Sequence, residues 1–444
     1  MFEMQVSVCK RNLTDYMKRG DYQMLCSKPT QTKINVIDSI MGSGKTSWAI
    51  QFMKNAPIYQ KFIYITPFKG EVDRVISSVD RDFKQPVADD KSDTKLQNIK
   101  RLIAEGENIV STHSLFKSID SEVNDLLEME SYTLILDEVM NVIEQVDISK
   151  DDLKMLSVNE VIEVDNKGVV HWKQPNYKKG YFEKLRNLAN SGNLMMYTDQ
   201  SNNPISVYWT FPVDTFKCFE EIYILTYLFD GQIQRAYFDL FDQKYSYHSI
   251  IKEENEYKLA PYVSYKKEDR SHLKELIDIY YLSAKDKRDL NKMGNNSSHF
   301  SVSDLKKKTK SKDTKKAIKD NAYNFYYNKC KVPTDEVMWT TFKEFKDNLT
   351  PRGLKGHFVS VNARATNEYK HKSTCIYLAN IYMNPLTSHF FTKQGVKVNI
   401  QLYALSELLQ WLFRSRIRTG QPINLYIPSV RMRTLLEQYL DNQI

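Results

Sequence analysis

The amino-acid sequence predicts an α/β protein with two lobes, each built around a parallel sheet. Short, continuous apolar segments alternate with helical patterns through the first half of the 444 residues, which is typical of parallel strands covered on both faces. The same alternation returns after residue 358, and the chain is too long for one ordinary domain. A glycine-containing loop between the first strand and the first helix adds a third observation, because such loops are typical of phosphate-binding α/β domains.

The first lobe is expected to span residues 1–235. Its strands are expected at 33–38, 61–66, 108–112, 132–137, 194–197 and 221–226, and its helices at 70–78, 94–104 and 114–128. The β-like stretch 161–172 contains an Asn-Lys-Gly turn, which predicts a hairpin inserted near residues 155–190.

Residues 236–350 are more polar and less periodic, and we expect them to form a connecting or accessory region. Within this region, residues 304–320 contain eight lysines and three aspartates, which predicts an exposed basic loop. The second lobe is expected at 351–444, together with part of the connecting region. Its strands are expected at 358–361, 399–402 and 423–427, and its helix at 404–418.

Charge and composition restrict the cellular setting. The chain carries a formal net charge of +8, of which the basic stretch supplies +5, so any attraction to phosphates is local. No apolar run is long enough to cross a bilayer, and the N-terminus lacks the pattern of a secretory signal. The five cysteines are scattered without a C-x-x-C pair, which is typical of reduced thiols. We therefore expect a cytoplasmic protein that does not bind membranes.

The loop at residues 39–46 reads Ser-Ile-Met-Gly-Ser-Gly-Lys-Thr. Its glycines let backbone N–H groups approach phosphate oxygens, and the following helix N-terminus adds positive potential. We expect Lys45 to reach the β- and γ-phosphates of ATP, and Thr46 to hold Mg²⁺ through its hydroxyl. Ser39 stands where the strict pattern has a glycine. The expected nucleotide-binding residues are Gly42, Ser43, Gly44, Lys45, Thr46 and Ser47.

A second motif follows about 90 residues later, where the apolar segment Leu134–Leu136 ends in Asp137 and Glu138. An ATPase needs carboxylates at this point: Asp137 is expected to bind Mg²⁺, and Glu138 to polarise the attacking water. Either acid alone is equally typical of a helix cap, and the spacing from the glycine-containing loop favours the catalytic interpretation.

The third motif lies near the C-terminus, where Gln410, Arg414 and Arg418 are each four residues apart. On one continuous helix this spacing places them in a row on a shared face. A row of cations is suited to stabilising charge on a γ-phosphate, and a second domain would supply it. The alternative is a solvated face that complements the helix dipole. The expected catalytic residues are Lys45, Asp137, Glu138, Gln410, Arg414 and Arg418.

These motifs resemble the superfamily 2 helicases, the DEAD/DEAH-like ATPases with two RecA-like P-loop lobes, and in particular a divergent phage-type member. Residues 41–46 resemble motif I, and Asp137–Glu138 resemble motif II. Segments 65–69, 109–113, 225–229, 358–367 and 410–418 are similar to motifs Ia, Ib, III, V and VI. In motif III, the resemblance implies that Thr226 couples the ATP state to strand contacts.

The sequence departs from this family in motifs II, III and VI. Motif III has Thr226-Tyr227 in place of the family's Ser/Thr-Ala-Thr. Met140 replaces the polar fourth residue of motif II, and Ile417 stands where the family has the second arginine of motif VI. Either Arg416 or Arg418 is therefore left to fill that role, and the shared-face argument favours Arg418.

The resemblance implies an ATP-dependent helicase or translocase that acts on single-stranded or duplex nucleic acid, held mainly through phosphates. The expected contacts are Thr66, Thr112, and Asn362 or Arg364. A role in phage DNA replication or recombination is implied, with replication proteins as partners and the host cytoplasm as location. Two alternatives remain open: a terminase-like packaging ATPase, and a nucleotide-dependent switch or loader. DNA versus RNA, translocation polarity and oligomeric state are not predicted.

Overall fold

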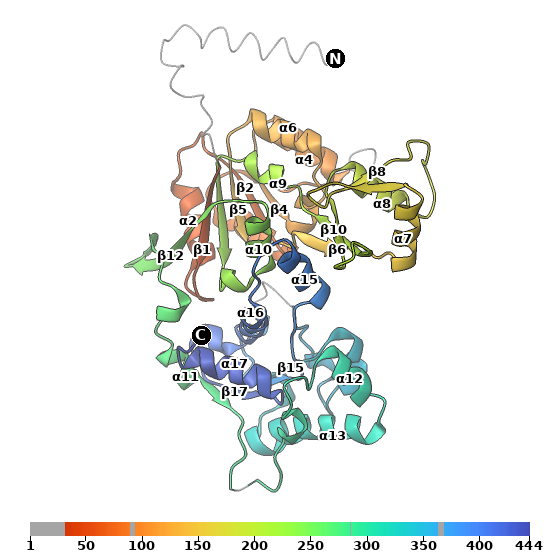
Figure 1. Cartoon of the computed structure of the whole chain (residues 1–444). Helices are drawn as coiled ribbons and strands as arrows, with labels where there is room; N and C mark the ends of the chain where they lie inside the picture. The colour runs from red at the N-terminus through yellow and green to blue at the C-terminus, as the bar shows by residue number, and fades with distance from the viewer. Residues whose placement is uncertain (1–31, 89–93, 285, 363–367) are drawn as a thin grey trace.

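The computed structural model describes residues 32–88, 94–284, 286–362 and 368–444. They form two lobes, with a small middle domain at the side of the first lobe (Figure 1). The first lobe carries an eight-stranded sheet and the second a four-stranded sheet. The predicted α/β class with parallel sheets is confirmed.

The large sheet has the order β13-β12-β1-β11-β5-β2-β4-β3. Every neighbouring pair is parallel except the β12–β13 hairpin. The carboxyl ends of parallel strands meet at one edge, where ligands bind in such sheets. The strands are β1 (Lys33–Asp38), β2 (Lys61–Thr66), β3 (Phe83–Lys84), β4 (Asn108–Thr112), β5 (Tyr132–Asp137), β11 (Glu221–Thr226), β12 (Tyr245–Glu253) and β13 (Glu256–Pro261).

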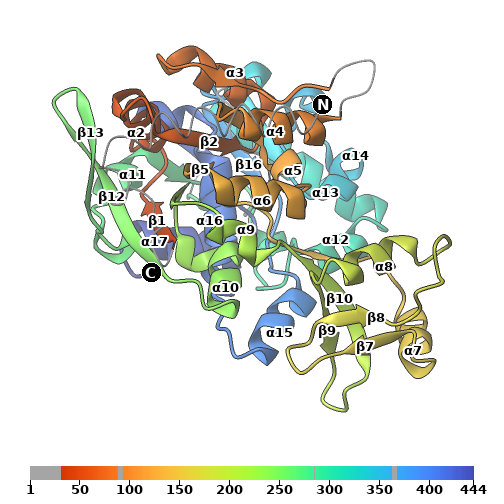
Figure 2. The ribbon, with the colours of Figure 1, turned by 90° about the horizontal axis from the view of Figure 1, so that it is seen from above.

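Helices cover both faces of this sheet (Figure 2). Residues alternate between the two faces along β2: Phe62 and Tyr64 pack with α2 and α3, whereas Ile63 and Ile65 pack with α4, α6 and α10. This period of two is what a strand imposes. The helices are α2 (Lys45–Asn55), α3 (Lys69–Ser78), α4 (Lys95–Ala104), α5 (His113–Phe116), α6 (Ser121–Met129), α9 (Val213–Lys217) and α10 (Ile233–Leu240).

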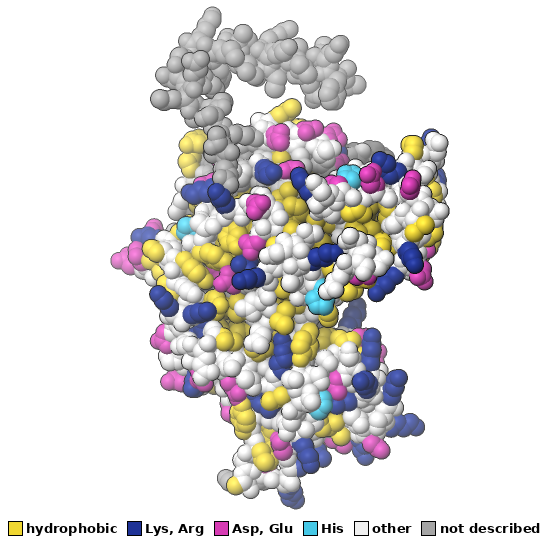
Figure 3. All heavy atoms as spheres, viewed as in Figure 1, with side chains coloured by type: hydrophobic (Ala, Val, Ile, Leu, Met, Phe, Trp, Pro, Cys, Tyr) yellow, Lys and Arg dark blue, Asp and Glu magenta, His cyan; other side chains and the backbone are white. Residues whose placement is uncertain are grey.

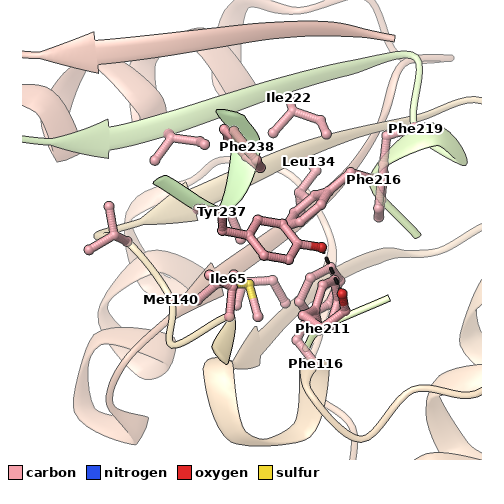
Figure 4. Close-up of a cluster of buried hydrophobic side chains, with 14 of the residues drawn as sticks. Ile65, Phe116, Leu134, Met140, Phe211, Phe216, Phe219, Ile222, Tyr237 and Phe238 are labelled. Carbon is pink, nitrogen blue, oxygen red and sulfur yellow. Dashed lines mark hydrogen bonds between the residues drawn. The ribbon is translucent and has the colours of Figure 1, made fainter. Parts of the chain in front are cut away.

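The aromatic side of this core is shown in Figure 4. Phe116, Phe211 and Phe216 pack around Tyr237, whose hydroxyl donates a hydrogen bond to the Phe211 carbonyl oxygen at 2.7 Å. The bond satisfies a fully buried hydroxyl, so the ring can sit in the core without an unpaired polar atom.

The middle domain projects from the first lobe between β5 and β11 (Figure 1). An antiparallel sheet and a hairpin enclose their own apolar cluster. The expected strand at 194–197 is present, but it belongs to this antiparallel sheet rather than to the large parallel one. The elements are β6 (Ile143–Gln145), α7 (Lys150–Val158), β7 (Ile162–Val164), β8 (Val170–Trp172), α8 (Glu183–Asn190), β9 (Leu194–Thr198) and β10 (Pro204–Thr210).

The second lobe is built on the parallel sheet β14-β17-β16-β15. Apolar clusters lie on both of its faces. Its strands are β14 (Ile277–Ile279), β15 (Val337–Thr340), β16 (Thr374–Tyr377) and β17 (Ile423–Tyr426). Its helices are α11 (Ser271–Leu276), α12 (Val302–Lys308), α13 (Lys312–Tyr323), α14 (Lys346–Leu349), α15 (Pro385–Lys393), α16 (Ile400–Leu412) and α17 (Val430–Leu440).

Three expectations for the second half were wrong. Residues 399–402 begin α16 instead of forming a strand, because the Asn399 side chain caps the helix by accepting from the Leu402 N–H. Segment 358–361 makes only an isolated bridge to Trp339. The lysine-rich stretch 304–320 lies in α12 and α13 rather than in a loop, and basic side chains gather over these helices at the lower right of Figure 3.

Helix α15 leaves the second lobe and packs on the first. Its Phe390 and Phe391 join the core of the first lobe, and Phe390 contacts the Tyr208 ring of the middle domain at 4.8 Å between centroids. Lys393 donates to the Thr198 carbonyl oxygen at 2.9 Å. The middle domain is therefore tied to both lobes. Among the described residues, no helix combines the length and the apolar character needed to cross a membrane.

Candidate nucleotide site between the lobes

A cavity of about 260 Å³ lies between the two lobes. It is lined by residues from the 39–46 loop and α2, from α3, from the end of β5, from β13, and from the end of α16. The lining residues are Met41, Gly42, Gly44, Lys45, Thr46, Ser47, Glu71, Arg74, Asp137, Glu138, Tyr257, Gln410, Phe413, Arg414 and Arg418. The fold thus brings all six expected catalytic residues to one cavity.

The 39–46 loop turns sharply through Gly42 and Gly44, whose φ angles are 88° and 96°. Such angles favour glycine, and a Cβ at Gly44 would also collide with the ring of Tyr257. Helix α2 starts directly after Gly44, with no side-chain cap and no acidic residue in its first turn. Its first N–H groups therefore remain suited to an anion. The buried hydroxyl of Ser43 also has no hydrogen-bond partner within the described residues.

The departure at Ser39 has a structural reason. Its hydroxyl accepts a hydrogen bond from the Ile250 N–H at 3.0 Å, and its own N–H donates to the Thr226 carbonyl oxygen at 3.1 Å. Ser39 therefore joins the loop to β12 on one side and to β11 on the other. A glycine would lose the first of these two bonds.

Lys45 points back into its own loop, where Nζ donates to the carbonyl oxygens of Ser39 and Ile40. Burial lowers the pKa of Lys45, and the nearby carboxylates of Glu138, Asp38 and Asp137 oppose that effect. A phosphate would supply the full negative partner that two carbonyl dipoles only approximate.

Asp137 ends β5 and is buried, and burial raises its pKa to about 7, with the neighbouring Glu138 adding to the effect. Glu138 follows with φ 73°, and its N–H donates to the Leu225 carbonyl oxygen at 2.9 Å. A left-handed glutamate is a strained conformation of the kind that clusters at functional sites. It turns the carboxylate into the cavity.

The donor set fits Mg²⁺, which binds through one or two carboxylates together with substrate phosphates. The Thr46 hydroxyl and the buried Asp137 carboxyl line one cavity. A dication beside Asp137 would offset the cost of ionising it there.

The second lobe contributes Gln410, Phe413, Arg414 and Arg418, but not as one helical row. Helix α16 ends at Leu412, and a 3₁₀ turn over Arg416–Thr419 follows. The shared-face argument was therefore wrong in its geometry. Arg418 nevertheless lines the cavity, whereas Arg416 does not and donates to the Pro422 carbonyl oxygen.

Sequence reasoning missed three residues that line the cavity. Glu71 and Arg74 on α3 form an ion pair with 2.6 Å between Oε2 and Nη1. The two residues are three positions apart, as in many ion pairs on helix surfaces. Their spacing therefore did not indicate a functional site. Tyr257 arrives from β13, and its N–H is held by Gln51 Oε1 at 3.0 Å.

The residues expected to contact nucleic acid or to couple it to ATP do not line this cavity, as far as the structure describes them. Thr66 and Thr226 are fully buried, and neither hydroxyl has a hydrogen-bond partner within the described residues. Burial of Thr66 argues against a direct phosphate contact. Thr112 is half-buried at the start of α5, and Asn362 is exposed. Arg364 lies outside the described residues.

Met140, the apolar replacement in motif II, is buried in the core beside the aromatic residues of Figure 4. Its backbone N–H donates to Gln234 Oε1 at 2.8 Å. The hydrogen bond made at this position therefore comes from the Met140 backbone and not from its side chain.

Comparisons with known proteins agree with this division of the chain. A family model described as the YonV C-terminal Rossmann-like domain matches residues 271–440, and one described as the YonV middle domain matches residues 143–209. The SPbeta prophage-derived protein YonV of Bacillus subtilis (strain 168) is 38% identical over 422 residues. These cover 93% of this chain and 99% of that protein.

Solved structures give weaker matches. A chain named XPD_APO is 12% identical with a TM-score of 0.47, covering 91% of this chain and 95% of its own. The DUF1998 helicase MrfA bound to DNA and AMPPNP is 9% identical with a TM-score of 0.32, covering 93% of this chain and 48% of its own. These values bear on neither activity nor residue roles. The relative and the two family models, by contrast, show that this chain belongs to the YonV family.

Proposed function

We propose that this chain is an ATP-dependent helicase or translocase that moves along single-stranded DNA or RNA. The supporting observation is the cavity lined by the 39–46 loop, by Asp137 and Glu138, and by the end of α16. A triphosphate held there would touch both lobes. Its hydrolysis would therefore change the position of one lobe relative to the other.

The first lobe would bind the phosphates. The N–H groups at the start of α2 would face the phosphate oxygens, and Lys45 would exchange two carbonyl partners for the β- and γ-phosphates. Bound Mg²⁺, held by Thr46 and Asp137, would neutralise phosphate charge. Glu138 would accept a proton from the water that attacks the γ-phosphorus.

The second lobe would complete the site. Arg414 and Arg418 would stabilise negative charge on the transferring γ-phosphoryl group, and Gln410 would orient groups beside it. These contacts form only when the lobes are close together, so ATP binding favours closure and product release favours opening. Alternate closing and opening would step a strand held by both lobes, with Thr112 and Asn362 contacting its phosphates.

The proposed biological setting is supported by the origin of the relative. YonV of Bacillus subtilis is prophage-derived by name, and we infer a role for this chain in phage DNA replication or recombination in the host cytoplasm. Replication proteins would be its partners.

Steady-state ATP hydrolysis, measured with and without single-stranded DNA and single-stranded RNA, tests the proposal. We expect turnover that depends on Mg²⁺ and rises severalfold with at least one of the two strands. Lys45→Ala should abolish turnover because the β/γ-phosphates lose their cation. The matched control is Lys54→Ala, an exposed lysine at the end of the same helix, which should hydrolyse ATP normally.

Turnover that no nucleic acid stimulates would contradict the motor and favour the nucleotide-dependent switch. Full activity in Lys45→Ala would contradict the nucleotide site itself. Cooperative thermal unfolding of both variants should show that each is folded, which separates a lost ligand contact from a lost fold.

A further inference from the structure

A second cavity, of about 520 Å³, lies on the middle domain, at the end of β8 and beside α8. It is lined by Trp172, Lys173, Gln174, Pro175, Arg186 and Asn190. We propose that this cavity and the adjoining loop bind single-stranded nucleic acid, separately from the track between the lobes. The inference rests on the proposed function only in its choice of ligand class.

Charge is segregated within the middle domain. Residues 167–186 carry six lysines and arginines and one glutamate, whereas the rest of 143–209 carries two lysines and eight acidic residues. Two of the cations, Lys173 and Arg186, line the cavity, and Lys178 and Lys179 lie in the loop that joins β8 to α8. A local cluster of this kind attracts a polyanion to one place rather than to the whole surface.

Aromatic side chains alternate with these cations. The Trp172 ring lies against Tyr177 with 5.3 Å between centroids, and Tyr181 is 83% exposed and packs edge-on against Phe182. Exposed aromatic faces beside lysines are what bases and phosphates of a single strand require together. An acidic peptide needs the cations but not the exposed rings.

The walls of the cavity are held in place by hydrogen bonds. Trp172 Nε1 donates to the Gln174 carbonyl oxygen at 2.9 Å, and the Tyr177 hydroxyl accepts from the Phe182 N–H at 2.8 Å. Arg186 donates to the carbonyl oxygens of Tyr177 and Lys178. The loop is thus fixed before a ligand arrives, which lowers the entropic cost of binding. The exposed amides of Gln174 and Asn190 offer donors and acceptors to a base edge.

The position of the domain gives this site a mechanical consequence. The end of β8 and helix α8 line the cavity, and both belong to the middle domain that projects from the side of the first lobe (Figures 1 and 2). The same domain is tied to the second lobe by Lys393 and by Phe390. A strand held here would follow any movement of α15 and would be kept close to the motor between steps.

Binding of a fluorescently labelled oligothymidylate, measured by anisotropy without nucleotide, tests the proposal. The double variant Lys178→Glu/Lys179→Glu should bind at least tenfold more weakly at low salt. The slope of log K against log salt should fall by about 1.4, since two phosphate contacts are lost from a single strand. Tyr181→Ala should weaken binding by about tenfold, because one stacking contact is lost.

The matched control is Lys150→Glu/Lys154→Glu, which makes the same charge change on exposed positions of α7 in the same domain. It should bind within twofold of the parent chain. Equal affinity in the two double variants would overturn the proposal and favour an acidic protein as ligand. Thermal unfolding excludes misfolding as the cause of lost binding, and because Tyr181 is exposed its removal leaves the core intact.

The binding test can fail or succeed independently of the ATPase test of the proposed motor function. Oligonucleotide binding lost in Lys178→Glu/Lys179→Glu supports this site even where ATP hydrolysis shows no stimulation by nucleic acid. Conversely, a stimulated ATPase in which both double variants bind equally supports the motor and removes this site.

Discussion

Lys45 and Asp137 are buried side chains of opposite charge type that line one cavity. Burial lowers the pKa of Lys45 and raises that of Asp137, so it favours the neutral form of both. Each side chain therefore costs stability in its ionised form, and the neighbouring opposite charges offset only part of that cost. Asp38 adds to this pattern, since burial raises its pKa to about 7 as well. A site arranged in this way is less stable alone than with its ligand.

The raised pKa of Asp137 predicts a pH-dependent stability. Its folded pKa of about 7 exceeds the ordinary 3.8, so its contribution is full below pH 4 and is lost as the pH rises through 7. Asp137→Asn should therefore raise the unfolding temperature more at pH 8 than at pH 5. The two pKa values set an upper bound of about 4 kcal/mol. Asp80→Asn, at an exposed position, should show no such difference, and equal effects at both pH values would contradict the prediction.

The arginines of the second lobe give a prediction about rate rather than affinity. In the proposed mechanism, Arg414→Ala should slow hydrolysis by about 10³-fold, because the charge that Arg414 would stabilise develops only in the transition state. ATP affinity, measured with a non-hydrolysable analogue, should change far less. Arg416→Ala is the matched control, since Arg416 does not line the cavity, and it should keep most of the activity. Normal hydrolysis by Arg414→Ala would show that the arginine assignment is wrong.

The residues that line the cavity between the lobes differ in how far the sequence indicated them. Gly44, Lys45 and Asp137 could be predicted to lie together because each belongs to a turn or a strand end, which is a local feature of the sequence. Glu71 and Tyr257 were not, because they reach the cavity only through the order of the strands and the placement of the β12–β13 hairpin. Strand order is a long-range property that no local pattern encodes.

Elements show the same contrast. Five strands of the large sheet (β1, β2, β4, β5 and β11) were predicted closely, because each is a continuous apolar run covered on both faces. The two-residue β3 and the largely exposed β12–β13 hairpin were not predicted. Helices α12 and α13 were missed because their apolar stripe is sparse, with Leu305 buried in one and Ile318 in the other. Their serine caps, Ser301 and Ser311, were the available signal.

The packing of α15 on the first lobe leads to a prediction about the free energy of unfolding. Phe391 is fully buried in the core of the first lobe although its helix belongs to the second. Phe391→Ala should therefore lower the free energy of unfolding by about 3–5 kcal/mol and loosen the second lobe from the first. Chemical denaturation measures the loss, with His389→Ala at an exposed position of the same helix as control. A loss below 1 kcal/mol would show that α15 is not a structural part of the first lobe.

At the scale of the whole molecule, the two lobes meet beside the segment that connects them. The hydroxyls of Tyr227 and Tyr439 lie 2.7 Å apart across the interface, and Tyr227 also donates to Glu268. Arg270 lies under the Tyr439 ring at 3.8 Å from its centroid. Gly231 approaches the backbone of Leu402 so closely that a Cβ there would collide with it. These contacts join the lobes at one end of the interface, and at the cavity Ile40 and Met41 of the 39–46 loop pack against the core of the second lobe.

A ligand that touches both sides of the cavity should therefore draw the lobes together. Small-angle X-ray scattering should show a smaller radius of gyration with a non-hydrolysable ATP analogue and Mg²⁺ than without. In Arg414→Ala/Arg418→Ala the analogue still meets the 39–46 loop, so binding persists while the decrease is lost. Lys45→Ala should lose the decrease as well, but through weaker binding, which a titration distinguishes. An equal decrease in the double-arginine variant would mean that closure is driven by the first lobe alone, and the arginines would then serve hydrolysis without coupling it to motion.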